Sequence, residues 1–461
     1  SQVAQASAAF SILLLRGFSQ LCLSSLVEPL RLANSLAGAE LFRWKLVSLD
    51  GRSVASAGDV NGDGFDDLII GTLGASAPAK TRNGVAYVVF GKNTTFTDVD
   101  LSTLTAGNAG FTMFGVANGD YLGYSVSNAG DFNKDGFGDF IVSSVYATYQ
   151  GRLKAGTAYV MFGKASYTAN IEFSSFSSGS GGFMVGGAEE LAYLGYAVSA
   201  AEDVNKDGYA DIMIGAPQES PGVPSRYHAG AVYIIYGHAS GFAEIDTASF
   251  ISGSGGFKVL GAQDDDGLGF SISTAGDFNH DGYQDIIVGS ASTGTACVIF
   301  GRGASASFPL VDVNTFGTNP QSGFRMTYPN ENVGAAVAAA GDVNSDGIDD
   351  IVIGSMGYYA VAYVLFGHTT STPFPNIDIS YYTSFFDLTR GFMISSPSYS
   401  GGLPAISCGD LNGDGLGDIV IGSLFGGTSV RGTVNVVYGR TEAPSAVPTL
   451  MPTAAPATVR P

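Results

Sequence analysis

Short runs of apolar and alternating residues, separated by glycine-rich turns, recur along most of the chain. Alternation is clear in Gly123-Tyr-Ser-Val-Ser127, and an apolar run follows an acidic segment in Asp211-Ile-Met-Ile-Gly215. Two further kinds of run are represented by Gly156–Gly163 and Gly182–Gly186. Period-two alternation and short apolar runs bounded by turn residues are typical of β-strands. The pattern therefore predicts four short strands in each unit of about 70 residues.

An acidic segment lies between the first two strands of each unit. It reads Asp59-Val-Asn-Gly-Asp-Gly-Phe-Asp-Asp67 in the first copy, and later copies begin at Asp131, Asp203, Asp277, Asp342 and Asp410. Four-stranded units that are repeated radially form the blades of a β-propeller. A β-solenoid is the alternative, but its repeats would be shorter and more uniform. We therefore predict an all-β fold, namely a β-propeller of six four-stranded blades. The repeat leaves open whether there is a seventh blade.

Each nine-residue segment has oxygen-bearing side chains at positions 1, 3, 5 and 9, and a glycine at position 6. A backbone carbonyl at position 7 can add a further oxygen. Hard oxygen ligands, mostly carboxylates, favour Ca²⁺ over transition metals. Turn formation alone would also favour Asp, Asn and Gly, but it does not require the same four oxygen positions six times. The sequence predicts up to six Ca²⁺ ions.

The predicted ligands occupy positions 1, 3, 5, 7 and 9 of the six loops. They are Asp59, Asn61, Asp63, Phe65 and Asp67; Asp131, Asn133, Asp135, Phe137 and Asp139; Asp203, Asn205, Asp207, Tyr209 and Asp211; Asp277, Asn279, Asp281, Tyr283 and Asp285; Asp342, Asn344, Asp346, Ile348 and Asp350; and Asp410, Asn412, Asp414, Leu416 and Asp418.

The residues immediately after these loops exclude an EF-hand. An EF-hand requires a bidentate glutamate at position 12 and a helix on each side. Position 12 is apolar in every copy, as in Ile70 and Val142, and belongs to a predicted strand. Dockerin-type loops are excluded for the same reason.

Composition narrows the classes of function. The formal net charge is −20, and 6 bound Ca²⁺ ions would change it to −8 (−20 + 12). Such an acidic chain does not attract nucleic acid or anionic membranes. The 3 cysteines are far apart and form neither a disulfide framework nor a zinc pattern. No nucleophile elbow, zinc signature or phosphate loop is present, so we expect no enzyme. No apolar run is long enough to span a bilayer.

The repeat resembles the FG-GAP repeats of integrin α-subunit propellers. Phe-Gly occurs at Phe90-Gly91, Phe162-Gly163, Phe300-Gly301 and Phe366-Gly367, with close variants at Tyr236-Gly237 and Tyr438-Gly439 and a Gly-Ala-Pro at Gly215–Pro217. The resemblance implies an extracellular protein with Ca²⁺ in its blade loops and a ligand or subunit on the opposite or upper face. Integrin propellers have seven blades, whereas this chain has six loops. Asn at position 3 of every loop predicts weaker affinity, which suits the millimolar Ca²⁺ outside cells.

The sequence divides into residues 1–50, a propeller over 51–440, and a Pro/Ala/Thr-rich linker over 441–461. Residues 1–50 have a β-α-β pattern that resembles the start of the amidotransferase-like domain of AraC-type transcriptional regulators. Within them, Phe42 to Ser48 is a candidate for the strand that closes the ring. Asn93-Thr-Thr95 is one N-glycosylation acceptor.

Three functions follow as hypotheses. The first is a secreted or cell-surface propeller for adhesion, with a protein or glycan ligand. The second is a non-catalytic accessory of a larger secreted hydrolase of the phospholipase kind, because FG-GAP propellers also accompany such domains. The third is a fusion with a fragment of a transcriptional regulator.

Overall fold

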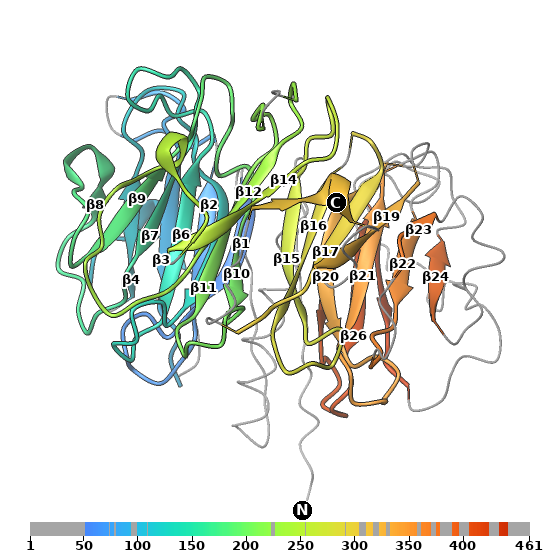
Figure 1. Cartoon of the computed structure of the whole chain (residues 1–461). Coiled ribbons are helices and arrows are strands. Elements are labelled where there is room, and N and C mark those ends of the chain that lie inside the picture. Colours follow the sequence, from blue (N-terminus) through green and yellow to red (C-terminus); the bar gives the residue numbers. More distant parts are fainter. Residues whose placement is uncertain are drawn as a thin grey trace, which may run out of the picture.

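The computed structural model describes residues 51–440 apart from short gaps, of which the longest are 379–389, 396–404 and 424–432. Six sheets, each built on antiparallel neighbours, follow one another along these residues (Figure 1). The first five contain the four strands that the repeat predicts. The sixth, near Tyr438, has three strands among the described residues. The predicted ring-closing segment and the whole of 1–50 lie outside the described residues.

Equivalent strands occupy the same place in each blade. The inner strands are β1 (Gly51–Gly58), β5 (Leu122–Gly130), β10 (Val198–Glu202), β15 (Ser271–Gly276), β20 (Val333–Gly341) and β25 (Ala405–Gly409). The second strands are β2 (Asp67–Thr72), β6 (Asp139–Ser144), β11 (Asp211–Ala216), β16 (Asp285–Ser290), β21 (Asp350–Ser355) and β26 (Asp418–Ser423). The third strands are β3 (Val85–Val89), β7 (Thr157–Met161), β12 (Ala231–Ile235), β17 (Thr295–Ile299), β22 (Val361–Leu365) and β27 (Thr433–Val437). The outer strands are β4 (Gly110–Phe114), β9 (Gly182–Gly186), β14 (Gly256–Leu260), β19 (Gly323–Thr327) and β24 (Gly391–Ser395).

The sequence pattern did not predict a short segment that precedes the outer strands. In this segment, two residues of one blade pair in parallel with the outer strand of the blade before it, as Ile171 and Glu172 do with β4. These pairs cover outer edges that would otherwise expose unpaired backbone groups. They are β8 (Ile171–Glu172), β13 (Ile245–Asp246), β18 (Val311–Asp312) and β23 (Ile377–Asp378). Three-residue 3₁₀ turns are the only helices among the described residues: η1 (Leu101–Thr103), η2 (Phe173–Ser175), η3 (Thr247–Ser249) and η4 (Val313–Thr315).

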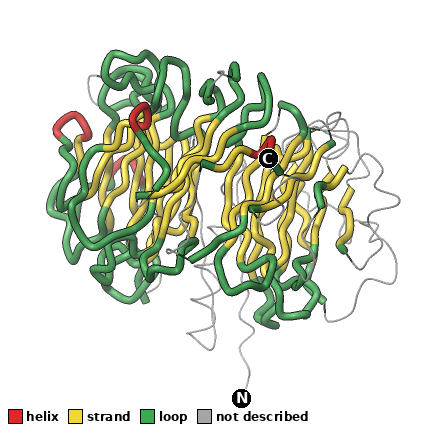
Figure 2. Tube along the Cα trace, viewed as in Figure 1, coloured by secondary structure: helices red, strands yellow, loops and turns green. Residues whose placement is uncertain are grey.

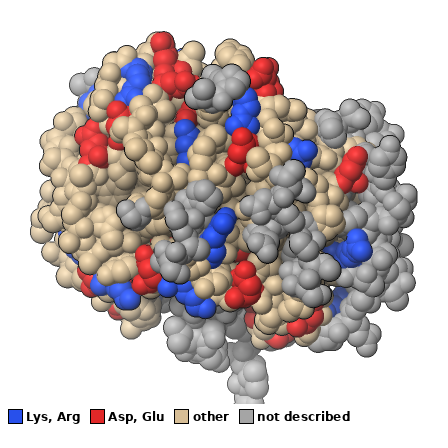
Figure 3. Space-filling view, in the orientation of Figure 1, with Lys and Arg blue, Asp and Glu red and all other residues tan. Residues whose placement is uncertain are grey.

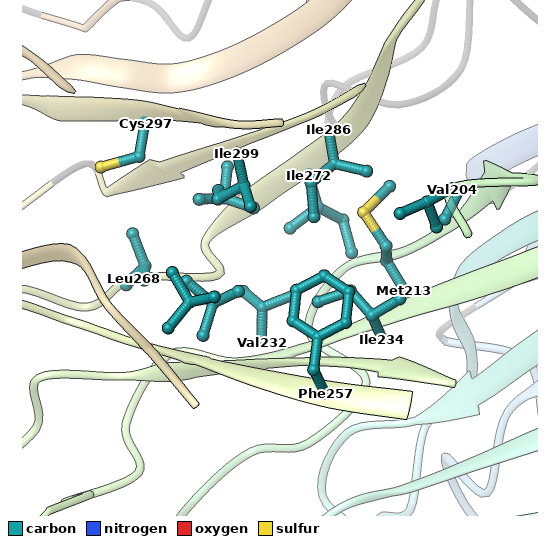
Figure 4. Packing of buried hydrophobic residues seen from close by; sticks show 14 of the residues in the cluster. Val204, Met213, Val232, Ile234, Phe257, Leu268, Ile272, Ile286, Cys297 and Ile299 are labelled. Carbon is teal, nitrogen blue, oxygen red and sulfur yellow. The ribbon is translucent and has the colours of Figure 1, made fainter. Parts of the chain in front are cut away.

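The hydrophobic core lies between the blades. Every residue of β2, β6, β11, β16 and β21 is buried, because both faces of these strands pack against side chains. Figure 4 shows one such interface, where Val232, Ile234 and Phe257 of the third blade face Ile272 and Ile286 of the fourth. Five of the six clusters of buried residues span consecutive blades in this way, and the sixth and smallest lies within the first blade.

The inner strands surround a central cavity of about 900 Å³ that is lined by residues from all six blades, among them Ser56 and Cys408 of the first and last. Strands fill the middle of the molecule, and loops gather at its two ends (Figure 2). The connections between first and second strands all lie at one end, which we call the loop end. The connections from second to third strands, and from one blade to the next, lie at the opposite end. The described residues form the predicted β-propeller.

The fully buried Phe257 tests whether stability resides between the blades. Phe257→Ala is expected to reduce the free energy of unfolding by about 3–5 kcal/mol, because a cavity replaces contacts with the next blade. Ile251→Ala is the matched control, since Ile251 is 85% exposed at the rim. Urea unfolding followed by tyrosine fluorescence measures both. Equal shifts for the two variants would contradict this description of the core.

Candidate metal loops and the opposite face

Each acidic segment forms a loop between an inner strand and the second strand of the same blade. The inner strand ends in a β-bulge in the first five blades, as where Gly58 pairs with Asp67. Position 6 is a glycine whose φ lies between +84° and +91° in all six loops. Only glycine adopts this conformation at little cost, which confirms the predicted sharp bend.

The carboxylates at positions 1 and 5 bond to the backbone of their own loop. In the first loop, Asp59 Oδ1 accepts a hydrogen bond from the backbone N–H of Asp63 at 3.0 Å, and its Oδ2 accepts one from Gly64 at 2.8 Å. Asp63 Oδ1 accepts one from Phe65 at 3.0 Å. The equivalent bonds occur in the other five loops. These bonds hold the loop in one shape and leave further lone pairs on each carboxylate.

The asparagine at position 3 lies against the aspartate at position 5. Asn61 Oδ1 accepts from the Asp63 N–H, while Asn61 Nδ2 donates to Asp63 Oδ2 at 2.9 Å. The same pair forms in every loop. Rotation of the Asn61 amide by 180° would place Asn61 Oδ1 beside Asp63 Oδ2. A bound cation stabilises such a pair of oxygens.

The aspartate at position 9 is fully buried in every loop. Asp67 Oδ2 accepts from the Val60 N–H at 2.9 Å, and its Oδ1 accepts from the N–H of Gly91 at 2.8 Å. The glycine of the Phe-Gly motif makes the second bond in all six blades. A Cβ on Gly91 would lie 2.4 Å from the carbonyl oxygen of Asp66, so no other residue fits. This role of the motif glycine was not predicted from the sequence.

Burial raises the pKa of these position-9 carboxyls. The pKa of Asp67 rises to about 8, mainly through desolvation, although the N–H bonds from Gly91 and Val60 oppose the rise. Asp63 and Asp59 add to it by charge repulsion. The pKa rises to about 7 for Asp139 and to about 8 for Asp211 and Asp350.

The donor atoms that the loops offer are of the kind that binds calcium. Each offers carboxylates at positions 1, 5 and 9, an amide at position 3 and a backbone carbonyl at position 7, all of them oxygen ligands of the hard type. Among the residues that the structure describes, no three acidic, His or Cys side chains are gathered into a preformed metal cluster. The assignment of the 30 ligand positions therefore stays a prediction.

Backbone hydrogen bonds join the first, third, fourth and fifth loops to the next blade. Lys164, which follows the second Phe-Gly, donates its N–H to the carbonyl of Val60 in the first loop at 2.9 Å. Arg302, His368 and Arg440 donate in the same way to the loops before theirs. A loop therefore lies at the interface between two blades, and its shape affects both.

Aromatic side chains gather at the opposite end. Tyr146 contacts Tyr121 and Tyr193 edge to face, with ring centroids 5.2 and 5.4 Å apart. Tyr124 and Tyr196 continue the array, and Tyr196 contacts Phe270 of the fourth blade. We call these residues the tyrosine array. Tyr124 belongs to β5, and the other members lie in four connections at this end. Sequence reasoning did not identify them.

Comparison with known proteins agrees with this architecture. A model of the FG-GAP repeat matches residues 51–89, 122–161, 194–235 and 268–299, which begin the first four blades. The chain is 30% identical to integrin alpha pat-2 of Caenorhabditis elegans over 275 residues, which are 58% of this chain and 19% of that protein. No comparison supports the resemblance of residues 1–50 to an AraC-type regulator, and the repeat matches begin at residue 51.

Phosphatidylinositol-glycan-specific phospholipase D is a second kind of relative. The bovine protein is 35% identical over 175 residues, covering 35% of this chain and 18% of that protein. The Dictyostelium discoideum protein is 28% identical over 307 residues, covering 63% and 30%. The chain thus spans less than a third of the length of these relatives. Its described residues form a β-propeller whose first four blades begin with matches to the FG-GAP repeat, and the chain is similar to parts of integrin α-subunits and of this phospholipase D.

Proposed function

We propose that the chain is an extracellular, calcium-stabilised propeller that binds a protein or glycan ligand through its tyrosine array, in adhesion rather than catalysis. Calcium in the six loops would brace the interfaces between blades at one end. The array at the other end would meet the ligand. The observation that carries the proposal is this separation of a self-bonded acidic end from an apolar, partly exposed aromatic end.

The opposite end has two features of a binding surface. Leu153 and Leu191 are 51% and 41% exposed, and the Leu191 N–H donates to the Leu153 carbonyl, so these two apolar residues are neighbours beside Tyr193. Tyr121, Leu191 and Tyr193 have φ values of 58°, 63° and 53°. Such left-handed backbone at non-glycine residues costs free energy and concentrates at functional sites. Tyrosine and exposed leucine are also suited to protein recognition.

Catalysis has no comparable support among the described residues. Glu219 is a buried acid away from the loops, and it is 3% exposed. Its two oxygens accept from the Tyr233 hydroxyl at 2.9 and 2.8 Å, and Lys258 Nζ lies 2.5 Å from Oε1. This mutually satisfied group is structural and holds no reactive atom toward solvent.

An extracellular position fits the other features. Asn93, the predicted glycosylation acceptor, is exposed. No helix among the described residues is long and apolar enough to cross a bilayer. On the face shown in Figure 3, charged side chains are scattered and form no broad basic patch. Scattered charge of this kind gives no support to nucleic-acid binding on this face.

The similarity to phospholipase D supports a second function, the non-catalytic accessory of a larger hydrolase. That function needs the same calcium loops but predicts contact with a catalytic domain of the same protein. A fused regulator has no supporting observation.

Calcium removal tests whether calcium stabilises the propeller. Metal-free protein should bind calcium in calorimetry, and its melting temperature should rise with calcium concentration. At 100 times the dissociation constant, each occupied site should add about 2.7 kcal/mol of stability. Asp135→Asn should remove one site, whereas the matched Glu190→Gln, an exposed acid at the opposite end, should remove none. A calcium-independent melting temperature would contradict calcium stabilisation.

The raised pKa values predict how the metal-free protein responds to pH. A raised carboxyl pKa contributes stability that is complete below the unfolded value near 3.9 and lost as pH rises through the folded value. With Asp67, Asp211 and Asp350 near 8 and Asp139 near 7, metal-free stability should fall between about pH 4 and pH 8. Melting in metal-free buffers measures this fall. Saturating calcium should abolish it, because a cation favours the ionised carboxylates. Metal-free stability that stays level or rises over this range would contradict the prediction.

Binding of a protein or glycan ligand by the tyrosine array is tested with a glycan array and a panel of purified matrix proteins, with calcium present. Leu191→Asp should weaken binding to any positive probe by at least about tenfold, because it places a charge in an apolar contact. Ile251→Asp at the outer rim is the matched control and should change nothing. Equal affinity for both variants would show that the tyrosine array is not the binding surface.

A further inference from the structure

The fourth residue of each acidic loop has a conformation that the sequence did not reveal. Its φ is left-handed in all six copies, at 59° for Lys134 and 58° for Lys206. In both of these loops the lysine side chain reaches the following loop. Lys134 Nζ lies 5.2 Å from the ring centroid of Tyr209, and Lys206 Nζ lies 5.1 Å from that of Tyr283.

The lysine nitrogens lie over the bend of the next loop. Lys206 Nζ donates to the carbonyl of Gly282 at 2.8 Å. A Cβ on Gly208 would lie 3.0 Å from Lys134 Nζ, and one on Gly282 would lie 3.3 Å from Lys206 Nζ. Each ammonium thus occupies the space beside the position-6 glycine, within the loop that supplies the next set of carboxylates.

Only the third and fourth loops receive such a lysine. Position 4 of the first loop, the one before the second loop, is Gly62, which has no side chain to reach forward. The ring of Phe137 from the second loop occupies the space that a Gly62 side chain would need. In the loops that precede the fifth and sixth loops, position 4 is His280 and Ser345 respectively. The six loops therefore differ in the charge that the preceding blade places beside them, although their own ligand residues match.

We infer that Lys134 and Lys206 are tethered cations that stabilise the third and fourth loops without metal and lower the calcium affinity of those loops. The inference rests on the proposed calcium binding. The Lys206 ammonium lies over the bend of the loop that carries Asp277, Asp281 and Asp285, and its charge reduces their mutual repulsion when no metal is bound. The same ammonium repels a bound Ca²⁺. Both effects favour the metal-free form, so the two loops require more calcium than the other four.

Two features of the lysines limit the size of the effect. Both side chains are exposed, and interactions between exposed charges are worth about 0.2–1 kcal/mol. Removal of one ammonium should therefore tighten calcium binding at the neighbouring loop by about 1.4- to fivefold at low salt. The gain should shrink at high salt, because ions screen charge but not packing.

The test uses the full chain and calcium chloride as the only ligand. Calorimetry of the wild type at low salt should resolve two weaker sites and four tighter ones. In K134M/K206M the weaker pair should merge with the others, and the melting temperature in chelator should fall. K206R should keep the wild-type profile.

Lys154→Met is the matched control. Lys154 is exposed, has a φ of 53° and lies 5.6 Å from the ring of Tyr146, but it belongs to the opposite end. It should leave calcium affinity unchanged. Unchanged or weaker affinity in K134M/K206M would overturn this inference alone, whereas the absence of calcium binding in the wild type would overturn the proposed function with it.

Discussion

The buried carboxylate at position 9 of each loop is the interaction on which the rest of the architecture depends. Asp67 joins three segments: its own second strand, the loop through Val60, and the end of the third strand through Gly91. A buried carboxylate with fewer partners would be costly, since an unsatisfied buried polar group costs about 1–3 kcal/mol. The repeat therefore requires an aspartate at position 9, a glycine after the third strand and a tight loop between them.

That local constraint has consequences for the whole ring because most of the core is shared between blades. The five larger clusters of buried residues each combine consecutive blades, as Met213 and Phe257 do with Ile286. The loops add backbone bonds across the same interfaces, such as the one from Lys164 to Val60. Any change in loop shape thus acts on packing between blades, which is why a divalent ion in a surface loop would stabilise more than the hairpin that holds it.

The sequence predicted what is local and repeated. Strand alternation and the bend at Gly64 follow from short segments, and the structure places them as expected, whereas the role of the acidic positions as calcium ligands stays a prediction. The parallel pairs such as Ile171–Glu172 could not be predicted, because two residues carry no periodicity and their partner lies in another blade. The tyrosine array could not be predicted for a similar reason, because Tyr121, Tyr146 and Tyr193 are far apart in the sequence and meet only when the blades are arranged in a ring.

The two ends of the propeller differ in how their polar groups are used. At the loop end, aspartate and asparagine oxygens already accept hydrogen bonds from their own backbone, and this fixes one shape in six copies. A surface so constrained by its own bonds has little freedom to vary with a partner. At the opposite end the connections differ in length and sequence from blade to blade, and they place strained, apolar residues such as Leu191 at the surface. Because the loop end maintains the ring, the opposite end is free to differ between blades, and a partner of irregular shape can be recognised only by a surface of that kind.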